Sequence, residues 1–218
     1  MKVIITGTTG MVGEGVLLEC LANQQVTEIL SVSRKPQSIR HPKLKEYIVP
    51  DFLSLKENDG NLKGYDACFF CAGISSVGMQ EPEYTRITYD TTLSFAKALS
   101  PKSQMTFAFI SGAGTDSSEK GRLMWARVKG KTENDLMKLP FKQVFAFRPG
   151  AMKHTESQKN LSRMNKVLSW LYPAFNTLFP NTANTISQLG QAMIYASQNG
   201  YTKKVLEVSD IKILAGKA

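Results

Sequence analysis

Three glycines near the amino terminus have the spacing of a phosphate-binding turn. Gly7, Gly10 and Gly13 form a GxxGxxG pattern in TGTTGMVGEG, directly after the apolar run VIIT at 3–6. We expect Gly7 to permit a tight turn, Gly10 to let a pyrophosphate approach the backbone, and Gly13 to allow close packing of helix on strand. A helix rich in valine and leucine follows, so the pattern predicts dinucleotide binding, the alternative being a turn kept for packing alone. The expected contacts are Gly7, Thr9, Gly10, Met11, Val12 and Gly13.

The end of the second apolar run bears on which dinucleotide is bound. Folds that prefer NAD place an Asp or Glu about 20 residues after the glycines, where it binds the ribose 2′-hydroxyl. Here the residues are Ser33, Arg34 and Lys35. A guanidinium can hold a 2′-phosphate through paired charge-assisted hydrogen bonds, so we expect NADP(H) to be favoured over NAD(H). Alternatively, Arg34 and Lys35 belong to a solvated basic surface with Arg40, Lys43 and Lys45.

Buried-strand runs alternate with helical patterns along the chain, which predicts a parallel sheet covered on both faces. The expected architecture is an α/β single-domain Rossmann fold over 1–218, a doubly wound parallel sheet of about seven strands with helices on both faces. The expected strands are 3–6, 28–33, 46–49, 67–71, 106–111, 144–148 and 204–209. The expected helices are Met11–Ala22, Glu81–Leu99, Lys120–Leu136 and Ser187–Gln198.

Composition limits the class of protein. The residues are 42% hydrophobic and 21% charged, which is typical of a globular protein. A chain of 218 residues is long enough to form a hydrophobic core without disulfides. With 27 Lys and Arg against 18 Asp and Glu, the net charge of +9 is consistent with an anionic ligand, a nucleic acid or a membrane surface, and does not choose among them. The basic residues at 120–131 have one aromatic residue among them, Trp125, so no nucleic acid is expected as a partner.

Cysteine and histidine usage argues against disulfides and metal. The three cysteines are an odd number, and Cys68 and Cys71 should point to opposite faces of a strand, as two packed core thiols. His41 and His154 are the two histidines, and nothing indicates a metal site. The amino terminus lacks the apolar length of a signal peptide, so a cytoplasmic location is expected.

One long segment interrupts the alternation. Residues 149–184 connect the sixth strand to the last helix, and we expect them to form a substrate-side excursion or lid. Within them, the apolar segment at 161–179 contains the longest apolar stretch of the chain, Val167–Phe179, whose 13 residues are interrupted by Pro173 and Asn176 and are too few to span a membrane. Packing on the core or on a second copy of the chain is an equally good account of its helical spacing, and a homodimer is left open.

Taken together, these motifs resemble the atypical branch of the short-chain dehydrogenase/reductase family, whose members are similar to NAD-dependent epimerases and dehydratases. The resemblance covers nearly the whole chain and implies further contacts to the cofactor. Asp51 and Phe52 match a pair that flanks adenine, and the loop after the fourth strand runs along the cofactor. Arg148, Pro149 and Gly150 match a segment beside the nicotinamide. The positions implied by the resemblance are Asp51, Phe52, Cys71, Ala72, Gly73, Lys129 and Pro149.

The catalytic signature of that family is matched only in part. The resemblance places Ser111 at the serine that ends the fifth strand and Lys129 at the lysine of Tyr-x-x-x-Lys. The tyrosine position holds Trp125, whose indole N–H only donates and cannot exchange a proton usefully at neutral pH. Tyr84, Tyr89, Asp90 and Asp116 are other polar candidates near this edge.

Two functions are consistent with these residues. The first is an NADP(H)-binding oxidoreductase or epimerase-like enzyme acting on a small carbonyl or hydroxyl substrate, with Ser111 and Lys129 positioning substrate and ribose. The second is a non-catalytic NADP(H)-binding sensor or regulatory partner, in which Trp125 fills the place of the tyrosine. Family membership favours the first and the replaced tyrosine favours the second.

Overall fold

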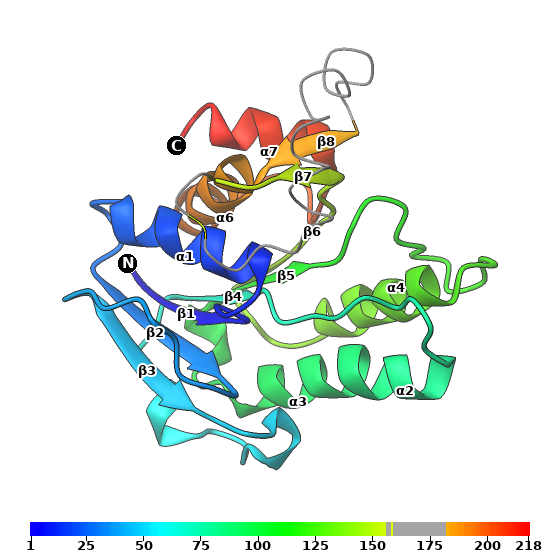
Figure 1. The fold of residues 1–218 in the computed structure, drawn as a ribbon, viewed down its shortest axis with the longest axis horizontal. Coiled ribbons are helices and arrows are strands. Elements are labelled where there is room, and N and C mark those ends of the chain that lie inside the picture. Colours follow the sequence, from blue (N-terminus) through cyan, green and yellow to red (C-terminus); the bar gives the residue numbers. More distant parts are fainter. Residues whose placement is uncertain (156–157, 159–181) are drawn as a thin grey trace.

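A computed structural model describes residues 1–155, 158 and 182–218, and its centre is one parallel sheet (Figure 1). Seven strands lie in the order β3-β2-β1-β4-β5-β6-β9, and each pairs with its neighbours in parallel. The strands are β1 (Lys2–Thr6), β2 (Glu28–Ser33), β3 (Leu44–Ile48), β4 (Ala67–Phe70), β5 (Thr106–Ile110), β6 (Gln143–Phe147) and β9 (Val205–Leu206).

Helices cover both faces of the sheet (Figure 1). One face carries α1 (Met11–Ala22), α6 (Ile186–Asn199) and α7 (Val208–Ala215); the other carries α2 (Glu81–Thr85), α3 (Thr91–Ala98) and α4 (Met124–Leu136). Alternation along β1 divides the core, since Val3 and Ile5 join one apolar cluster while Ile4 joins the other. The predicted doubly wound Rossmann sheet of about seven strands is therefore confirmed.

The predicted helix at 81–99 forms in three parts. Between α2 and α3, residues Arg86–Asp90 make a wider π-type turn, and Pro82 stands in the first turn of α2, where a proline is tolerated.

Two predicted boundaries are wrong for local reasons. The helix expected from Lys120 begins at Met124, because the carboxylate of Asp116 accepts hydrogen bonds from the N–H groups of Ser118 and Gly121 and holds 116–121 as a turn. The strand expected over 204–209 ends at Leu206, because Glu207 caps α7 through a reciprocal pair of hydrogen bonds with Asp210.

A small second sheet was not predicted. Strands β7 (Ala151–Lys153) and β8 (Ala183–Thr185) pair in parallel at the ends of the long 149–184 connection. Buried Asn184 accepts a hydrogen bond from Gly150 N at 3.3 Å and donates one to Val208 O at 3.3 Å, which ties this sheet to α7. Most of the expected lid, and the whole apolar stretch at 161–179, lie outside the described residues.

Candidate nucleotide-binding and active site

The glycine turn has the geometry that its sequence predicts. Gly7 adopts φ +71°, and a Cβ built on it would lie 2.7 Å from Ala72 N. A Cβ on Gly13 would overlap the Gly7 carbonyl oxygen, so the start of α1 packs closely on the turn. By contrast, a Cβ on Gly10 meets only the Gly7 oxygen, at 3.4 Å, and Gly10 is exposed at the amino terminus of α1. The two outer glycines therefore serve packing, while the middle one borders open space.

Two buried hydroxyls fix this turn to the neighbouring strands. The Thr6 Oγ1 accepts hydrogen bonds from Cys71 N and Ala72 N, both at 3.1 Å. Thr8 Oγ1 lies 2.7 Å from Ser31 Oγ on β2. The loops after β1 and β4, and strand β2 beside them, are consequently held in one fixed arrangement, although sequence reasoning had given neither threonine a role.

The loop after β2 leaves two cations available. Ser33 Oγ donates to Lys35 O at 2.7 Å and shapes the turn, while Arg34 and Lys35 are exposed, and neither makes an ion pair with any described residue. The other basic residues of this region are engaged. Arg40 pairs with Glu46 at 2.5 Å, Lys45 pairs with Glu28 at 2.8 Å, and Lys43 donates to Leu21 O and Asn23 O at the end of α1.

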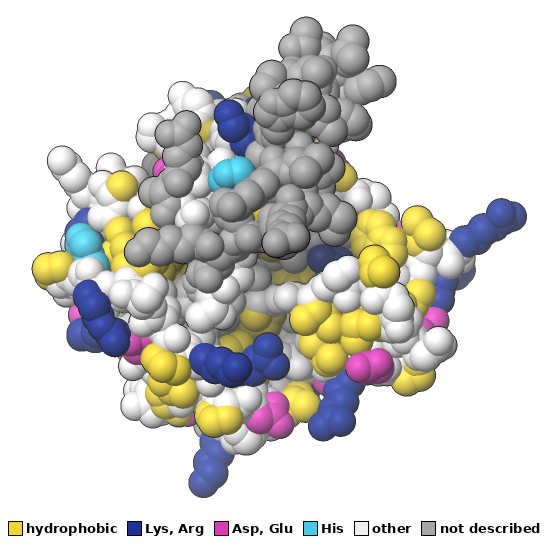
Figure 2. All heavy atoms as spheres, in the orientation of Figure 1, with side chains coloured by type: hydrophobic (Ala, Val, Ile, Leu, Met, Phe, Trp, Pro, Cys, Tyr) yellow, Lys and Arg dark blue, Asp and Glu magenta, His cyan; other side chains and the backbone are white. Residues whose placement is uncertain are grey.

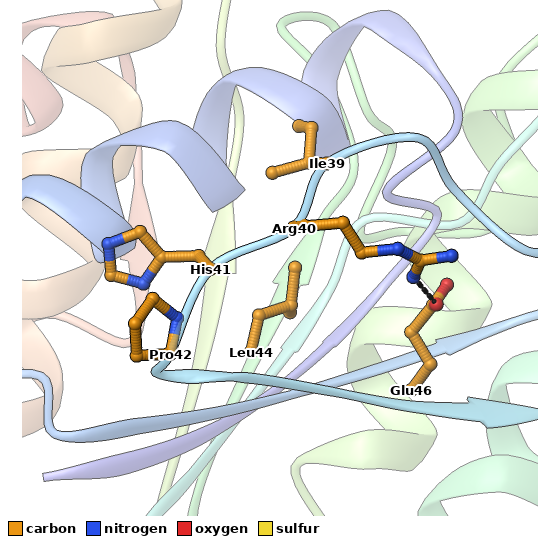
Figure 3. Close-up of a pocket in the computed structure, with 6 residues that line it drawn as sticks. All are labelled: Ile39, Arg40, His41, Pro42, Leu44 and Glu46. Atoms are coloured by element: carbon orange, nitrogen blue, oxygen red, sulfur yellow. Dashed lines mark hydrogen bonds and ion pairs between the residues drawn. The ribbon is translucent and has the colours of Figure 1, made fainter.

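Two surface hollows lie along the edge strand β3 and away from the glycine turn. One, of about 550 Å³, is lined by Ile39–Pro42, Leu44 and Glu46, and Figure 3 shows the Arg40 side chain directed toward the Glu46 carboxylate, with which it forms an ion pair. The other, of about 520 Å³, follows 47–50 and 54–60. Neither lining includes a glycine of the turn, Ser111 or Lys129, so the hollows add nothing to the dinucleotide site.

Asp51 and Phe52, the pair predicted to flank adenine, make contacts within the protein. Asp51 is exposed and accepts a hydrogen bond from Leu53 N at 2.9 Å, which begins a short 3₁₀ turn. The Phe52 ring is 6% exposed and lies among core aromatics, 5.0 Å from the Phe95 ring. Only the exposed face of this turn is left to border a ligand, and the predicted role stays a prediction.

The cysteines of the CxxC pattern face opposite sides of the sheet, as predicted. Cys68 belongs to the apolar cluster beneath α3, while Cys71 packs against the cluster beneath α1. Burial raises the pKa of both thiols well above the usual value, so neither is poised for redox chemistry. Within the part of the chain that the structure describes, no group of three or more His, Cys, Asp or Glu could hold a metal. No helix among those residues is long and apolar enough to cross a membrane.

At the end of β5, Ser111 is bound into a buried ionic network. Its Oγ donates to Glu133 Oε1 at 2.5 Å, and Glu133 is 1% exposed. Arg148 donates two hydrogen bonds to the same carboxylate, from Nε at 3.0 Å and from Nη2 at 2.5 Å. Further contacts from Arg148 reach Ser117 Oγ at 2.6 Å and Glu207 at 3.2 Å. The network joins β5, α4, the end of β6 and the start of α7.

Lys129 approaches the same strand end. Its Nζ donates to the Ser111 carbonyl oxygen, and burial lowers the pKa of Lys129 to about 8, although nearby Glu133 opposes the shift. The structure thus brings together the two residues that the resemblance placed in the catalytic signature. Glu133, one helical turn after Lys129, is the residue that sequence reasoning missed.

Trp125 is half-buried and packs beside the loop that follows β5. A Cβ built on Gly114 would lie 3.6 Å from the indole ring. Tyr84 is 1% exposed and lies inside the fold, Tyr89 donates to Asp135 at 2.7 Å, and Asp116 accepts the hydrogen bonds of its own turn. Asp90 is exposed in the π-type turn. Among the described residues, no hydrogen bond or ion pair joins any of these four side chains to Ser111 or Lys129.

The segment after β6 continues along the same edge. Pro149 is buried, and its carbonyl oxygen accepts a hydrogen bond from Ala113 N at 2.8 Å, so the loops after β5 and β6 stay paired beyond the strands. Gln158 Nε2 donates to Met11 O at 2.5 Å, which brings the end of the β7 segment over the first turn of α1.

Among the described residues, the backbone at the carboxyl ends of three strands leaves room for a ligand. A Cβ built on Gly73, after β4, or on Gly112, after β5, meets no atom of a described residue within 4 Å, and a Cβ on Gly10 meets only the Gly7 oxygen, at 3.4 Å. The three positions follow neighbouring strands in the order β1, β4, β5. An extended ligand that needs close approach to the backbone would fit along this edge.

Comparison with known sequences finds relatives among mitochondrial proteins. No family model matches the chain. It is 27% identical over 192 residues to "Protein FMP52, mitochondrial" of Debaryomyces hansenii, covering 86% of this chain and 82% of that protein. It is 30% identical over 156 residues to "Protein fmp52, mitochondrial" of Emericella nidulans, covering 68% and 66%. These names point to a mitochondrial rather than a cytoplasmic location, and the cytoplasmic prediction is therefore wrong.

Solved structures share the fold at low sequence identity. "MoeE5 in complex with UDP-glucose and NAD" superposes with a TM-score of 0.68 at 16% identity, covering 100% of this chain and 81% of that one. An oxidoreductase of the short-chain dehydrogenase/reductase family from Burkholderia thailandensis gives a TM-score of 0.69 at 13% identity, with 95% and 90% covered. These likenesses confirm the predicted fold.

Proposed function

Because this chain has the fold of the short-chain dehydrogenases and reductases, we propose that it binds a nicotinamide dinucleotide across the carboxyl ends of its sheet. The observation that carries the proposal is the glycine turn. Gly7 and Gly13 have no room for a side chain, whereas Gly10 leaves the first N–H groups of α1 open to an anion. Open space at Gly73 and Gly112 extends this cradle along the edge.

Residues on successive loops would hold the cofactor. The turn and first helical residues would bind the pyrophosphate, the loop after β2 the adenosine ribose, and the loops after β4 and β6 the nicotinamide half. The residues concerned are Gly7, Thr9, Gly10, Met11, Val12, Gly13, Ser33, Arg34, Lys35, Asp51, Phe52, Cys71, Ala72, Gly73, Lys129 and Pro149. When bound, the nicotinamide supplies or accepts a hydride.

We propose NADP(H) rather than NAD(H) as the cofactor. Arg34 and Lys35 are exposed and make no ion pair with any described residue, whereas Arg40 and Lys45 pair with glutamates and Lys43 donates to backbone carbonyl oxygens. An unpaired guanidinium at the end of β2 suits a 2′-phosphate.

The proposed reaction is oxidation, reduction or epimerisation of a small carbonyl or hydroxyl compound. Support comes from the convergence of Ser111 and Lys129 at the end of β5, next to the open edge. The network of Glu133 and Arg148 keeps the strand end and α4 in register, so these two groups are held in fixed positions.

A non-catalytic NADP(H)-binding module is the second candidate. Two observations favour it: Trp125 stands where a proton-exchanging tyrosine is expected, and the Ser111 hydroxyl already donates to Glu133. In this case the cofactor would report redox state to a partner protein.

A thermal-shift comparison with NADPH, NADH and no ligand tests the cofactor proposal. Saturation at 100 times the dissociation constant adds about 2.7 kcal/mol, or roughly 5 to 11 °C for a chain of this size. We expect NADPH to stabilise the wild type more than NADH, and Arg34→Asp to abolish or reverse that preference. Arg40→Gln is the matched control, since Arg40 lies in the same connection but is paired with Glu46.

Three outcomes separate the alternatives. No stabilisation by either nucleotide would refute cofactor binding. Equal stabilisation by both, unchanged in Arg34→Asp, would refute only the NADP(H) preference. Tight NADPH binding without NADPH oxidation across a broad carbonyl panel would favour the non-catalytic module.

A further inference from the structure

Lys129 lies at the end of β5 with N–H groups that no described residue accepts. Its Nζ has three N–H groups, and one of them donates to the Ser111 carbonyl oxygen. No other acceptor for Nζ is found among the described residues. The side chain is half-buried beside the open edge at Gly112, so the remaining N–H groups are within the region where we place the substrate.

The neighbouring groups cannot supply a proton in this arrangement. Ser111 Oγ is 2.5 Å from Glu133 Oε1 and donates its proton to that carboxylate, so toward a substrate it is left as an acceptor. Glu133 receives three hydrogen bonds, from Ser111 and from two nitrogens of Arg148, and acts as an acceptor only. Trp125 has an indole N–H, which is a donor without acid–base function near neutral pH.

The charges around Lys129 are on three elements. Glu133 lies one turn further along α4 and favours the ammonium form of Lys129. Arg148, directly after β6, pairs with Glu133 and so offsets the negative charge of that carboxylate. Glu207, at the start of α7, pairs with another nitrogen of Arg148. Burial outweighs the attraction of Glu133 and lowers the pKa of Lys129 to about 8. A proton-exchanging group works best when its pKa lies near the operating pH.

We propose that Lys129 exchanges a proton directly with the substrate oxygen, in the role left open by Trp125. This inference rests on the proposed reductase function. In the reducing direction a bound nicotinamide would supply a hydride to the carbonyl carbon, and Lys129 Nζ would give a proton to the carbonyl oxygen as the C=O π pair moves onto it. The products are the alcohol, the oxidised cofactor and a neutral amine, which regains its proton from water. Oxidation runs through the same transfers in reverse.

The protonation of Lys129 can be measured without cofactor. Competitive labelling of the whole protein with trace acetic anhydride across pH 6 to 11, followed by peptide mass spectrometry, gives the pH at which each lysine becomes reactive. We expect Lys129 to become half-reactive near pH 8, below a free lysine derivative added as the reference. Half-reactivity of Lys129 at the same pH as this reference would overturn the proposal.

Turnover then tests the role. Lys129→Arg keeps the positive charge, but a guanidinium does not release its proton below about pH 12. At saturating NADPH, which separates cofactor affinity from turnover, we expect Lys129→Arg to lose about 10²- to 10⁴-fold in kcat and to lose the change of kcat near pH 8. His154→Gln, which removes the histidine that follows β7, is expected to leave the pH profile unchanged.

Each result has a distinct meaning. Turnover by Lys129→Arg within a few-fold of wild type, or loss of the pH dependence in His154→Gln instead, overturns the assignment to Lys129. NADPH binding by the wild type without any turnover overturns it as well and supports the non-catalytic module. Failure of the wild type to bind NADPH refutes the cofactor proposal itself, whatever the labelling shows.

Discussion

The buried pair of Glu133 and Arg148 predicts a large loss of stability when either partner is removed alone. The side chains are 1% and 10% exposed and are joined by two hydrogen bonds at 2.5 and 3.0 Å. Removing one member of a buried ion pair leaves the other charge uncompensated and costs about 3 to 5 kcal/mol. At roughly 2 to 4 °C per kcal/mol for a chain of this length, the expected fall in Tm is about 6 to 20 °C.

The two single variants should differ in a direction that the contacts define. Arg148→Met leaves the Glu133 carboxylate with Ser111 as its one side-chain hydrogen-bond partner among the described residues and with Lys129 as a nearby cation, whereas Glu133→Gln leaves Arg148 with Ser117 and Glu207. We therefore expect Arg148→Met to be the more destabilising of the two. The double variant should lose less than the sum of the singles, by about 1 to 3 kcal/mol, because no unpaired charge then remains buried.

Urea unfolding at pH 7, followed by circular dichroism, measures all three variants. Arg40→Gln is the control, since the Arg40 side chain is 74% exposed and its pair with Glu46 should contribute at most about 1 kcal/mol. Single variants within 1 kcal/mol of wild type, or strictly additive effects, would show that the network does not hold the site together as argued.

Three further predictions follow from individual positions. In Gly13→Ala the new methyl group would overlap the Gly7 carbonyl oxygen, so we expect the free energy of unfolding in urea to fall by about 1 to 3 kcal/mol. Gly10→Ala should keep near-wild-type stability and lose affinity for NADPH. Equal losses of stability in the two variants would contradict the assignment of Gly13 to packing and of Gly10 to the ligand. Because the pKa of Lys129 is lowered to about 8, the unfolded chain binds more protons than the folded chain between about pH 8 and 10.5. The free energy of unfolding of the wild type should therefore rise with pH in that window relative to that of Lys129→Met. A difference between the two proteins that stays constant across the window would contradict the lowered pKa. Trp125→Tyr restores an ionisable hydroxyl one helical turn before Lys129, and we expect NADPH-dependent carbonyl reduction to rise by about 10- to 100-fold in steady-state assays. A variant no faster than the wild type would contradict the match of Trp125 to the tyrosine position.

The parts of the fold that local pattern determines were predictable. The glycine turn, helix α1 and the buried runs of the sheet follow from spacing and from what a strand-to-helix turn requires. Cys68 and Cys71 illustrate the same point, since an offset of three along a strand is enough to put them on opposite faces.

What could not be predicted depends on contacts between distant segments. Nothing in the spacing of Glu133 and Arg148 shows that the connection from α4 to β6 brings them together, and a single acidic residue on a helix normally faces solvent. The end of β9 was missed because VLEVS is apolar enough for a longer strand, and Glu207 ends it only through its hydrogen bonds with Asp210. Strands β7 and β8 have three residues each, too few for a period to be recognised.

The anchoring of the glycine turn by Thr6 has a consequence for the order of folding. The turn and α1 are complete within the first 22 residues, yet the N–H groups that Thr6 accepts come from Cys71 and Ala72, and β1 pairs with β4 from Val3↔Ala67 onward. Contacts between segments this far apart carry a loop-closure penalty and form late. A nascent chain shorter than about 72 residues would therefore carry the phosphate-binding sequence without the cradle. Nucleotide added to a refolding chain would then slow its unfolding without speeding its folding.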